Sequence, residues 1–228
     1  MSVRCVFFDL DYTLFDLCQY STGALCDVSE YLGTTTGRSV SEVRQVFLQE
    51  LERGHQHVLN RGLLALGFTE HEKLIAALVD IYRSHQPSLA LYPDVISTLH
   101  SLREMGCKLG VVTNGTLSTQ QKKVTALGLT PWLDVIVYAD ALGRAHWKPS
   151  SLPYRVALEA LNGNPTETMY VGDDPHTDFK GALMIGMTTV RILRGEFQQI
   201  AEEPLFPPDH IIMSLEELIT LISRDSAS

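Results

Sequence analysis

The amino-acid sequence predicts an α/β protein in which a parallel sheet is flanked by helices and interrupted by an inserted helical domain. Short apolar runs rich in β-branched residues recur along the chain, and such runs are typical of strands that are buried on both faces. Helical patterns separate these runs, and this alternation indicates parallel strands joined by right-handed crossovers. One long interval keeps the helical pattern but contains no convincing strand. Together these observations favour a Rossmann-like sheet with an insertion after its first strand.

Each predicted strand is a short apolar run of this kind. The strands comprise residues 3–8, 109–113, 135–138, 169–171 and 188–193, with a weaker candidate at 211–213. The helices between them are marked by apolar residues at helical spacing, namely Val95, Leu99 and Leu102, then Val124 and Leu127, then Tyr154, Ala157, Leu158 and Leu161. The last helix is predicted from a capping box, Ser214 with Glu217, before a further apolar series.

Residues 17–88 are predicted to form the inserted domain, a helical cap, and residues 1–16 and 89–228 the α/β core. Helical spacing persists through the interval, in the series Val43, Val46, Phe47 and Leu51 and in the series Leu74, Ala77, Leu78 and Ile81. Because open α/β sheets bind ligands at the carboxyl ends of their strands, an insertion after the first strand is expected to cover that edge. An insertion used only for dimerisation is the alternative.

The composition argues against several classes of function. The net charge of −9 argues against a nucleic-acid partner, because that binding normally needs a basic face. No apolar run approaches the roughly 18 residues of a membrane span, and the first apolar stretch is too short for a signal peptide. The four cysteines have no metal-binding spacing and are expected to be reduced thiols of a cytoplasmic protein. An acidic protein that binds a phosphate must supply positive charge locally, from a metal ion or a lysine.

Aspartates follow two of the predicted strands. Asp9 and Asp11 end the first strand, and residues two apart on a strand point the same way, so both carboxylates can reach one site. Asp173 and Asp174 end the fourth strand, and Asp178 follows in the first turn of the next helix. Helix capping explains one aspartate, but not three beside a matching pair on another strand. Carboxylate oxygens at one sheet edge are the ligands that Mg²⁺ prefers, so we expect a magnesium site.

Two other strand ends offer groups that bind phosphate. Thr113, Asn114 and Gly115 follow the second strand, where a hydroxyl and free amides at a strand-to-helix turn can bind an anion. An ordinary turn is the alternative interpretation of these residues. Lys148 begins the unit after the third strand, where its ammonium can reach inward and neutralise phosphate oxygens. A lysine before a proline is otherwise a solvated loop charge.

These four elements together resemble the motifs of the haloacid dehalogenase superfamily. The run from Asp9 to Thr13 resembles the first motif, Thr113-Asn114-Gly115 the second, Lys148-Pro149 the third, and Gly172-Asp173-Asp174 with Asp178 the fourth. The four occur in the family's order and span nearly the whole chain. The predicted insertion resembles the helical C1 cap of the phosphatase-rich branch of that superfamily. The resemblance implies a phosphatase that acts on a small phosphorylated metabolite.

The resemblance also implies covalent catalysis by Asp9. Its carboxylate would attack phosphorus and form an aspartyl-phosphate, while Asp11 would protonate the leaving oxygen and then take a proton from the hydrolytic water. Dehalogenases of the family lack the second aspartate of the first motif, so Asp11 argues against a 2-haloacid dehalogenase. A phosphonatase would need a cap lysine to form a Schiff base, and residues 17–88 contain only Lys73. A phosphomutase, which shares the aspartyl-phosphate, and a catalytically silent binding protein are the remaining alternatives.

The remaining motif residues are implied to bind metal and phosphate. The expected Mg²⁺ ligands are Asp9, the backbone carbonyl of Asp11, and Asp173, with Asp174 and Asp178 completing the coordination through water or orienting Lys148. The groups expected to bind the oxygens of the transferred phosphoryl group are Thr113, the amide of Asn114, and Lys148. The lysine and the metal ion then supply the positive charge that the acidic chain needs locally.

The sequence leaves the identity of the substrate open. Cationic residues that could contact a second anionic group or border the site are Arg53, His55, His57 and Arg61 in the predicted cap and Arg144 and His146 before the third motif. A solvated helix face and loop are the simpler interpretation of the cap residues. A sugar phosphate, a nucleoside monophosphate and a small phosphorylated acid are all compatible with the sequence.

Overall fold

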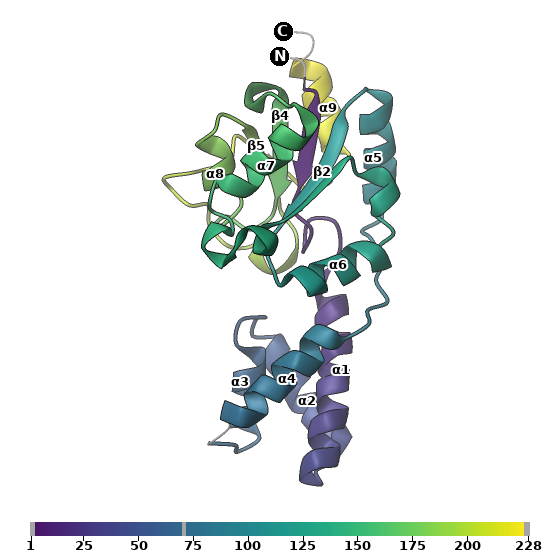
Figure 1. Cartoon of the computed structure of the whole chain (residues 1–228), viewed down its shortest axis with the longest axis vertical. Helices are drawn as coiled ribbons and strands as arrows, with labels where there is room; N and C mark the ends of the chain where they lie inside the picture. The colour runs from purple at the N-terminus through teal and green to yellow at the C-terminus, as the bar shows by residue number, and fades with distance from the viewer. Residues whose placement is uncertain (1–2, 70–71, 226–228) are drawn as a thin grey trace. The chain divides into compact units, whose positions relative to one another are not determined.

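The computed structural model describes residues 3–69 and 72–225, within which six strands form one sheet (Figure 1). The strands are β1 (Cys5–Phe8), β2 (Lys108–Thr113), β3 (Val135–Tyr138), β4 (Thr168–Gly172), β5 (Thr188–Ile192) and β6 (His210–Ile212). They lie in the order β3-β2-β1-β4-β5-β6, and all neighbouring pairs are parallel. The predicted fold class is therefore confirmed. In such a sheet ligands bind where the strand order reverses, here at the carboxyl ends of β1 and β4.

Helices cover both faces of this sheet. On one face α5 (Val95–Glu104) contacts α9 (Glu217–Asp225), and on the other α7 (Leu152–Leu161) contacts α8 (Phe179–Leu183) (Figure 1). Alternate residues of a strand point to opposite faces, and Cys5 and Phe7 of β1 pack into one apolar cluster with Tyr154 of α7 and Ala182 of α8. The helix that follows β2 is α6 (Leu117–Ala126). Short 3₁₀ helices lie at Thr130–Trp132, Ala139–Leu142, Arg144–His146, Pro165–Glu167 and Gly195–Phe197.

The capping box predicted for the last helix is present in part. The Glu217 carboxylate accepts hydrogen bonds from the backbone N–H groups of Met213 and Ser214, at 2.8 and 3.0 Å. The Ser214 hydroxyl accepts from the N–H of Glu216 at 3.3 Å, not from that of Glu217. Because α9 begins only at Glu217, the box closes the turn that precedes the helix.

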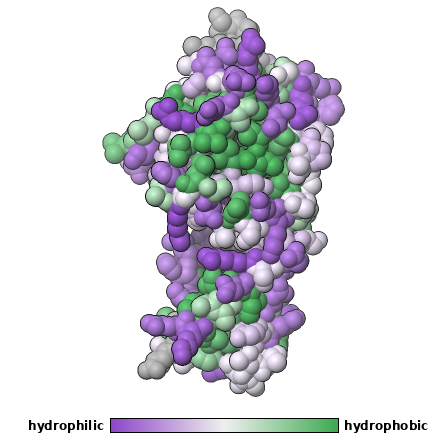
Figure 2. All heavy atoms as spheres, viewed as in Figure 1, coloured by the Kyte–Doolittle hydropathy of each residue, from purple (hydrophilic) through white to green (hydrophobic). Residues whose placement is uncertain are grey.

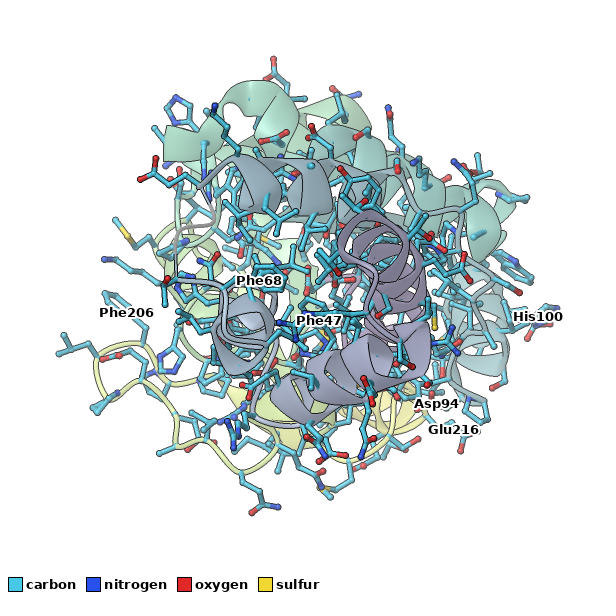
Figure 3. All side chains as sticks on the ribbon, turned by 90° about the horizontal axis from the view of Figure 1, so that it is seen from below. Phe47, Phe68, Asp94, His100, Phe206 and Glu216 are labelled. Atoms are coloured by element: carbon cyan, nitrogen blue, oxygen red, sulfur yellow. The ribbon has the colours of Figure 1, made fainter. Side chains whose placement is uncertain are left out.

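The chain divides into two compact units. The core unit ends at Asp16 and resumes at Ala90, and the helical unit runs from Leu17 to Leu89. The helical unit consists of α1 (Leu17–Thr36), α2 (Val40–Leu51), α3 (Val58–Ala65) and α4 (Glu72–Ser84). It has an apolar cluster of its own, in which Phe47 points in among the helices (Figure 3). A Cβ on Gly62 would lie 2.2 Å from the Phe47 ring, so only glycine permits α2 and α3 to pack this closely.

The two connections between the units lie side by side where they meet the core unit. Phe15, on the outgoing segment, forms an antiparallel bridge with Leu91 on the returning segment. The backbone N–H of Tyr92 donates to the carbonyl of Leu14 at 3.0 Å. Arg194 then joins both segments, because it forms an ion pair with Asp94 at 3.0 Å and donates to the carbonyl of Thr13.

Figure 2 shows polar side chains, in purple, on the visible surface of each unit, together with apolar patches, in green, on both units. Among residues 3–69 and 72–225, no helix has both the length and the apolar character needed to cross a membrane.

Candidate active site

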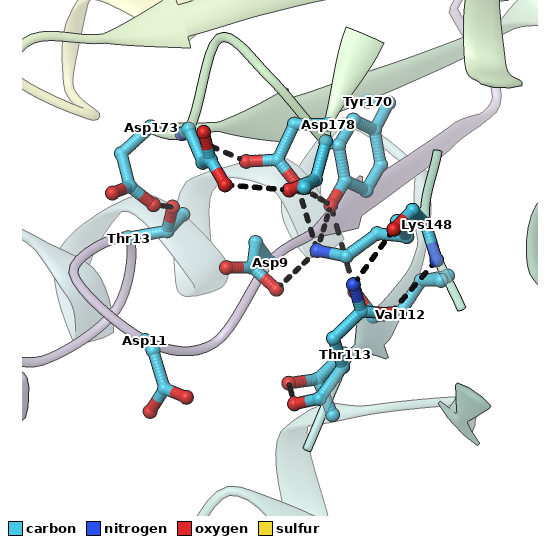
Figure 4. Close-up of polar contacts among 12 residues, drawn as sticks. Asp9, Asp11, Thr13, Val112, Thr113, Lys148, Tyr170, Asp173 and Asp178 are labelled. Carbon is cyan, nitrogen blue, oxygen red and sulfur yellow. Dashed lines mark hydrogen bonds and ion pairs between the residues drawn. The ribbon is translucent and has the colours of Figure 1, made fainter. Parts of the chain in front are cut away.

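Lys148 lies at the centre of a buried polar cluster at the carboxyl ends of β1 and β4 (Figure 4). Its Nζ lies 2.5 Å from Asp9 Oδ1 and 2.7 Å from Asp178 Oδ1, and it donates to the Tyr170 hydroxyl at 2.9 Å. Burial lowers the pKa of Lys148, but Asp178 and Asp9 outweigh burial and hold that pKa well above the ordinary value of a lysine. The cluster therefore joins a charged lysine to the predicted nucleophile.

The sheet brings these groups together through its register. Phe8 of β1 lies opposite Val171 of β4, and the backbone N–H of Asp9 donates to the carbonyl of Val171 at 2.8 Å. The residues that follow β1 and β4 therefore emerge at the same level. Gly172 ends β4, and a Cβ at this position would lie 2.3 Å from Asp178 Oδ2. A glycine is needed here because the Asp178 carboxylate occupies the space that a side chain would fill.

Asp9, Asp173 and Asp178 form a group that could hold a cation. One carboxylate oxygen from each lies within 4.8 Å of the others, and all three residues are buried. Burial, together with the carboxylates of Asp178 and Asp11, raises the pKa of Asp9 to about 7 against the effect of Lys148. Burial also raises the pKa of Asp173 well above its ordinary value, with Asp178 and Asp9 adding to that effect. Hard oxygen donors that repel one another in this way fit the predicted Mg²⁺.

These raised pKa values predict how pH and Mg²⁺ affect stability. A carboxyl group whose pKa is higher in the folded state binds more protons folded than unfolded, so unfolding becomes easier as pH rises from about 4 through about 7. We expect the Tm of the protein in EDTA to fall between about pH 5 and about pH 8. Added Mg²⁺ should raise Tm more at the higher pH, because it binds the ionised carboxylates of the folded state. Thermal unfolding at both pH values checks this, and an equal Mg²⁺ shift at the two would contradict it.

The carboxylates of Asp11 and Asp174 have other partners. Asp174 folds back on its own loop, where it accepts hydrogen bonds from the backbone N–H of His176 at 2.9 Å and from the Thr177 hydroxyl at 2.7 Å. The Asp11 carboxylate lies 2.7 Å from Nζ of Lys123. The structure thus separates the five aspartates into three that converge and two whose side chains bind elsewhere. Metal coordination by Asp174 stays a prediction.

The second predicted phosphate-binding element is built around the end of β2. The Thr113 hydroxyl is buried and accepts a hydrogen bond from Nε2 of Gln120 at 2.7 Å. The Asn114 side chain clamps the Lys148 backbone, donating to its carbonyl at 3.0 Å and accepting from its N–H at 2.9 Å. The Asn114 side chain therefore fixes the loop that carries the lysine, a contact that the sequence did not indicate.

Several side chains of the site had no role assigned to them from the sequence. The Tyr170 hydroxyl donates to Asp178 Oδ1 at 2.9 Å, and the Thr13 hydroxyl donates to Asp173 Oδ1 at 2.9 Å (Figure 4). Tyr170 lies in an apolar strand and so resembled a core residue. Gln120 and Lys123 lie three residues apart on α6, and their common helix face next to the second motif is the signal that could have identified them.

The cationic residues of the predicted cap divide into two groups. Arg53 and Arg61 both form ion pairs with Glu50, at 2.7 and 3.0 Å, so these contacts stabilise the helical unit itself. His55 and His57 line a cavity of about 320 Å³ within the helical unit. In the core unit, the Arg144 guanidinium lies over the ring of Trp147 and His146 is exposed.

The chain matches known proteins of one family. The family model described as haloacid dehalogenase-like hydrolase matches residues 6–192. A glyceraldehyde 3-phosphate phosphatase of Methanopyrus kandleri is 35% identical over 206 residues, which cover 87% of each chain. A ribulose-1,5-bisphosphate 5-phosphatase of Halopiger xanaduensis is 30% identical, over 96% of this chain and 98% of that protein.

The solved structures include a similar protein as well. The crystal structure of a phosphatase of the same family from Thermococcus onnurineus superposes with a TM-score of 0.66 at 28% identity. The match covers 96% of this chain and 98% of the other. The likeness therefore spans the core unit and the helical unit.

Proposed function

Since the chain belongs to the haloacid dehalogenase-like hydrolases and is a phosphatase, we propose that it is a cytoplasmic, Mg²⁺-dependent enzyme that hydrolyses a small phosphomonoester through an aspartyl-phosphate on Asp9. The observation that carries this proposal is the contact between Asp9 and Lys148 beside Asp173 and Asp178. A buried carboxylate, a lysine and further oxygen ligands are what phosphoryl transfer needs at one point.

Chemistry begins with attack by Asp9. One of its carboxylate oxygens bonds to phosphorus as the bond to the leaving oxygen breaks, and Asp11 gives the leaving oxygen a proton. A water molecule then attacks the phosphorus of the aspartyl-phosphate and gives a proton to Asp11, which releases inorganic phosphate and restores the Asp9 carboxylate. Lys148 and the Thr113 hydroxyl bind the phosphoryl oxygens and hold them against Asp9.

Asp9, Asp173 and Asp178, with the backbone carbonyl of Asp11, are the residues that would hold Mg²⁺. The bound ion supplies positive charge that lets two anions, the nucleophile and the phosphate, approach each other. Lys148 shares this task and is itself held by the Asn114 clamp. These local positive charges offset the repulsion expected between a phosphate and a chain with a net charge of −9.

We propose that the substrate is a short phosphorylated sugar or aldehyde and that the helical unit is the cap that selects it. The support is the relative that is named for glyceraldehyde 3-phosphate and matches 87% of this chain. Within the helical unit a cavity is lined by His55, His57 and Arg83, side chains that can bind hydroxyl, carbonyl or anionic groups. We expect hydrolysis, not isomerisation, so the phosphate released should equal the substrate consumed.

A panel of phosphorylated metabolites tests this proposal. With Mg²⁺ present, we expect glyceraldehyde 3-phosphate to give the highest kcat/KM, ahead of ribulose 1,5-bisphosphate and of pyrophosphate. Colorimetric assay of inorganic phosphate gives the rates, and ³¹P NMR of the remaining ester detects any isomer that a phosphomutase would make. Preference for a nucleoside monophosphate would contradict the proposed substrate class, and an isomerised ester without phosphate release would contradict the reaction.

A further inference from the structure

The Asp11 carboxylate is held by two side chains of α6. Lys123 Nζ lies 2.7 Å from Asp11 Oδ1 and 3.0 Å from Asp11 Oδ2, so the ammonium reaches both oxygens. Nε2 of Gln120 also donates to Asp11 Oδ2, at 3.2 Å. Asp11 is turned away from Lys148 and Asp178 (Figure 4), so each of the two aspartates of the first motif has a lysine of its own.

Burial differs across the Lys123–Asp11 pair in an informative way. The Lys123 side chain is 5% exposed, whereas the Asp11 side chain is 24% exposed. Packing therefore fixes the lysine: its Nζ lies over the Phe15 ring, 5.8 Å from the centroid, and its side chain is buried. The lysine holds the carboxylate from its buried side and leaves part of it open. An aspartate that must meet both a leaving group and a water molecule needs this combination.

Gln120 connects the same carboxylate to the phosphate-binding element. Its Nε2 donates to the Thr113 hydroxyl at 2.7 Å as well as to Asp11. The Gln120 side chain is buried, with 1% of the residue exposed, so little water competes for these hydrogen bonds. One amide thus sets the distance between the hydroxyl that binds the phosphoryl group and the carboxylate that serves the leaving oxygen.

We propose that Lys123, with Gln120, is a positioning residue for Asp11, which it keeps aimed at the leaving oxygen and then at the hydrolytic water. This inference rests on the acid–base role of Asp11 in the proposed function. Lys123 donates hydrogen bonds and transfers no proton. Because its Nζ reaches both oxygens, whichever oxygen lacks the proton still accepts from it, and the carboxyl group keeps its place in both half-reactions.

The leaving group tests this inference. An alkoxide needs a proton as its bond to phosphorus breaks, whereas 4-nitrophenolate leaves without one, so only alkyl phosphates depend on a correctly aimed Asp11. The ratio of kcat/KM for glycerol 3-phosphate to kcat/KM for 4-nitrophenyl phosphate reports protonation of the leaving oxygen. The reason is that kcat/KM covers the steps up to formation of the aspartyl-phosphate and does not depend on its later hydrolysis. We expect Lys123→Met to lower this ratio by about 10²-fold, the usual effect of a misplaced catalytic group. Lys122→Met, the same change at the neighbouring lysine, should leave the ratio at the wild-type value.

Additional variants separate positioning from a structural effect. Lys123→Arg keeps a cation with several donors and should recover most of the ratio. Gln120→Met should lower the ratio in the same direction, by about tenfold, and covers the case in which Lys123→Met fails to fold. The double variant Asp11→Asn with Lys123→Met should match Asp11→Asn alone, because a residue that acts through Asp11 has nothing left to position.

The outcomes distinguish this inference from the proposed function. If Asp11→Asn lowers the ratio by about 10²-fold or more while folded Lys123→Met and Gln120→Met do not, the inference is overturned and the role of Asp11 stands. Equal losses on both substrates in Lys123→Met, or an added loss in the double variant, would also overturn it. A wild-type ratio in Asp11→Asn would instead overturn the acid–base role itself.

Discussion

Replacement of Asp9 by asparagine is expected to abolish turnover, with kcat reduced by about 10⁴-fold or more. The amide has nearly the shape of the carboxylate but cannot bond to phosphorus, so the covalent step is lost while the substrate still binds. The rate of phosphate release checks the first part of this expectation. Acid quenching during turnover followed by mass spectrometry checks the second, because a phosphoryl group should be found on the peptide that contains Asp9 in the wild type and be absent in the variant.

The stability of the Asp9→Asn variant gives an independent check. Burial raises the pKa of Asp9 to about 7, so near pH 8 the ionised carboxylate lowers the stability of the metal-free fold. The variant should therefore have a Tm in EDTA at least equal to that of the wild type, which would show that inactivity is not unfolding. Glu159→Gln, a similar change at an exposed position of α7, should retain activity. Turnover by folded Asp9→Asn at a wild-type rate would contradict the assignment of the nucleophile.

Removal of the Lys148 ammonium should reduce both activity and stability. Lys148→Met leaves Asp9 and Asp178 facing each other without the cation that lies 2.5 and 2.7 Å from them. Removing one partner of a buried ion pair typically costs about 3–5 kcal/mol, and the Lys148 and Asp178 side chains are 2% and 0% exposed. We expect the free energy of unfolding in EDTA to fall by about this amount, as measured by urea denaturation, and kcat/KM to fall by about 10³-fold.

A second substitution should separate these two effects. The double variant Lys148→Met with Asp178→Asn removes one of the two carboxylate charges that would otherwise face each other. The asparagine keeps nearly the shape of the aspartate, so much of the lost stability should return. Activity should not return, because no cation then binds the phosphoryl oxygens beside Asp9. Recovery of activity in the double variant would contradict the role of Lys148 as a phosphate-binding residue. Unchanged stability in the single variant would contradict the importance of the ion pairs.

The parts of the fold that could be predicted from the sequence are those that local patterns encode. Each predicted strand corresponds to an observed strand within one or two residues, because buried parallel strands need continuous apolar runs. Asp9 and Asp173 were recognisable because the ends of parallel strands meet at one edge of the sheet. Arg191 is an exception to the rule that buried strands consist of apolar residues. It lies in β5 with no exposed surface, and its guanidinium binds Glu202 and the carbonyls of Phe197 and Ile200.

The contacts that could not be predicted are those that depend on side-chain direction across separate elements. Lys123 is one of two adjacent lysines in the sequence, and only the packing of α6 in the core unit brings it to Asp11. The clamp of Asn114 on the Lys148 backbone joins residues 34 positions apart. The shared helix face of Gln120 and Lys123 marks the two side chains in the sequence but does not identify the residue that they contact. The motif residues could therefore be picked out from the sequence, whereas the contacts that neighbouring side chains make with them could not.

The pairing of Phe15 with Leu91 has an evolutionary consequence. The 73 residues of the helical unit leave and re-enter the core unit through one antiparallel bridge, like the loop of a hairpin. The entropy of closing a loop grows only slowly with its length, so inserts of quite different size can be carried at this position. Selection can then replace the insert, and with it the substrate choice proposed for the helical unit, while the residues of the core unit are inherited unchanged.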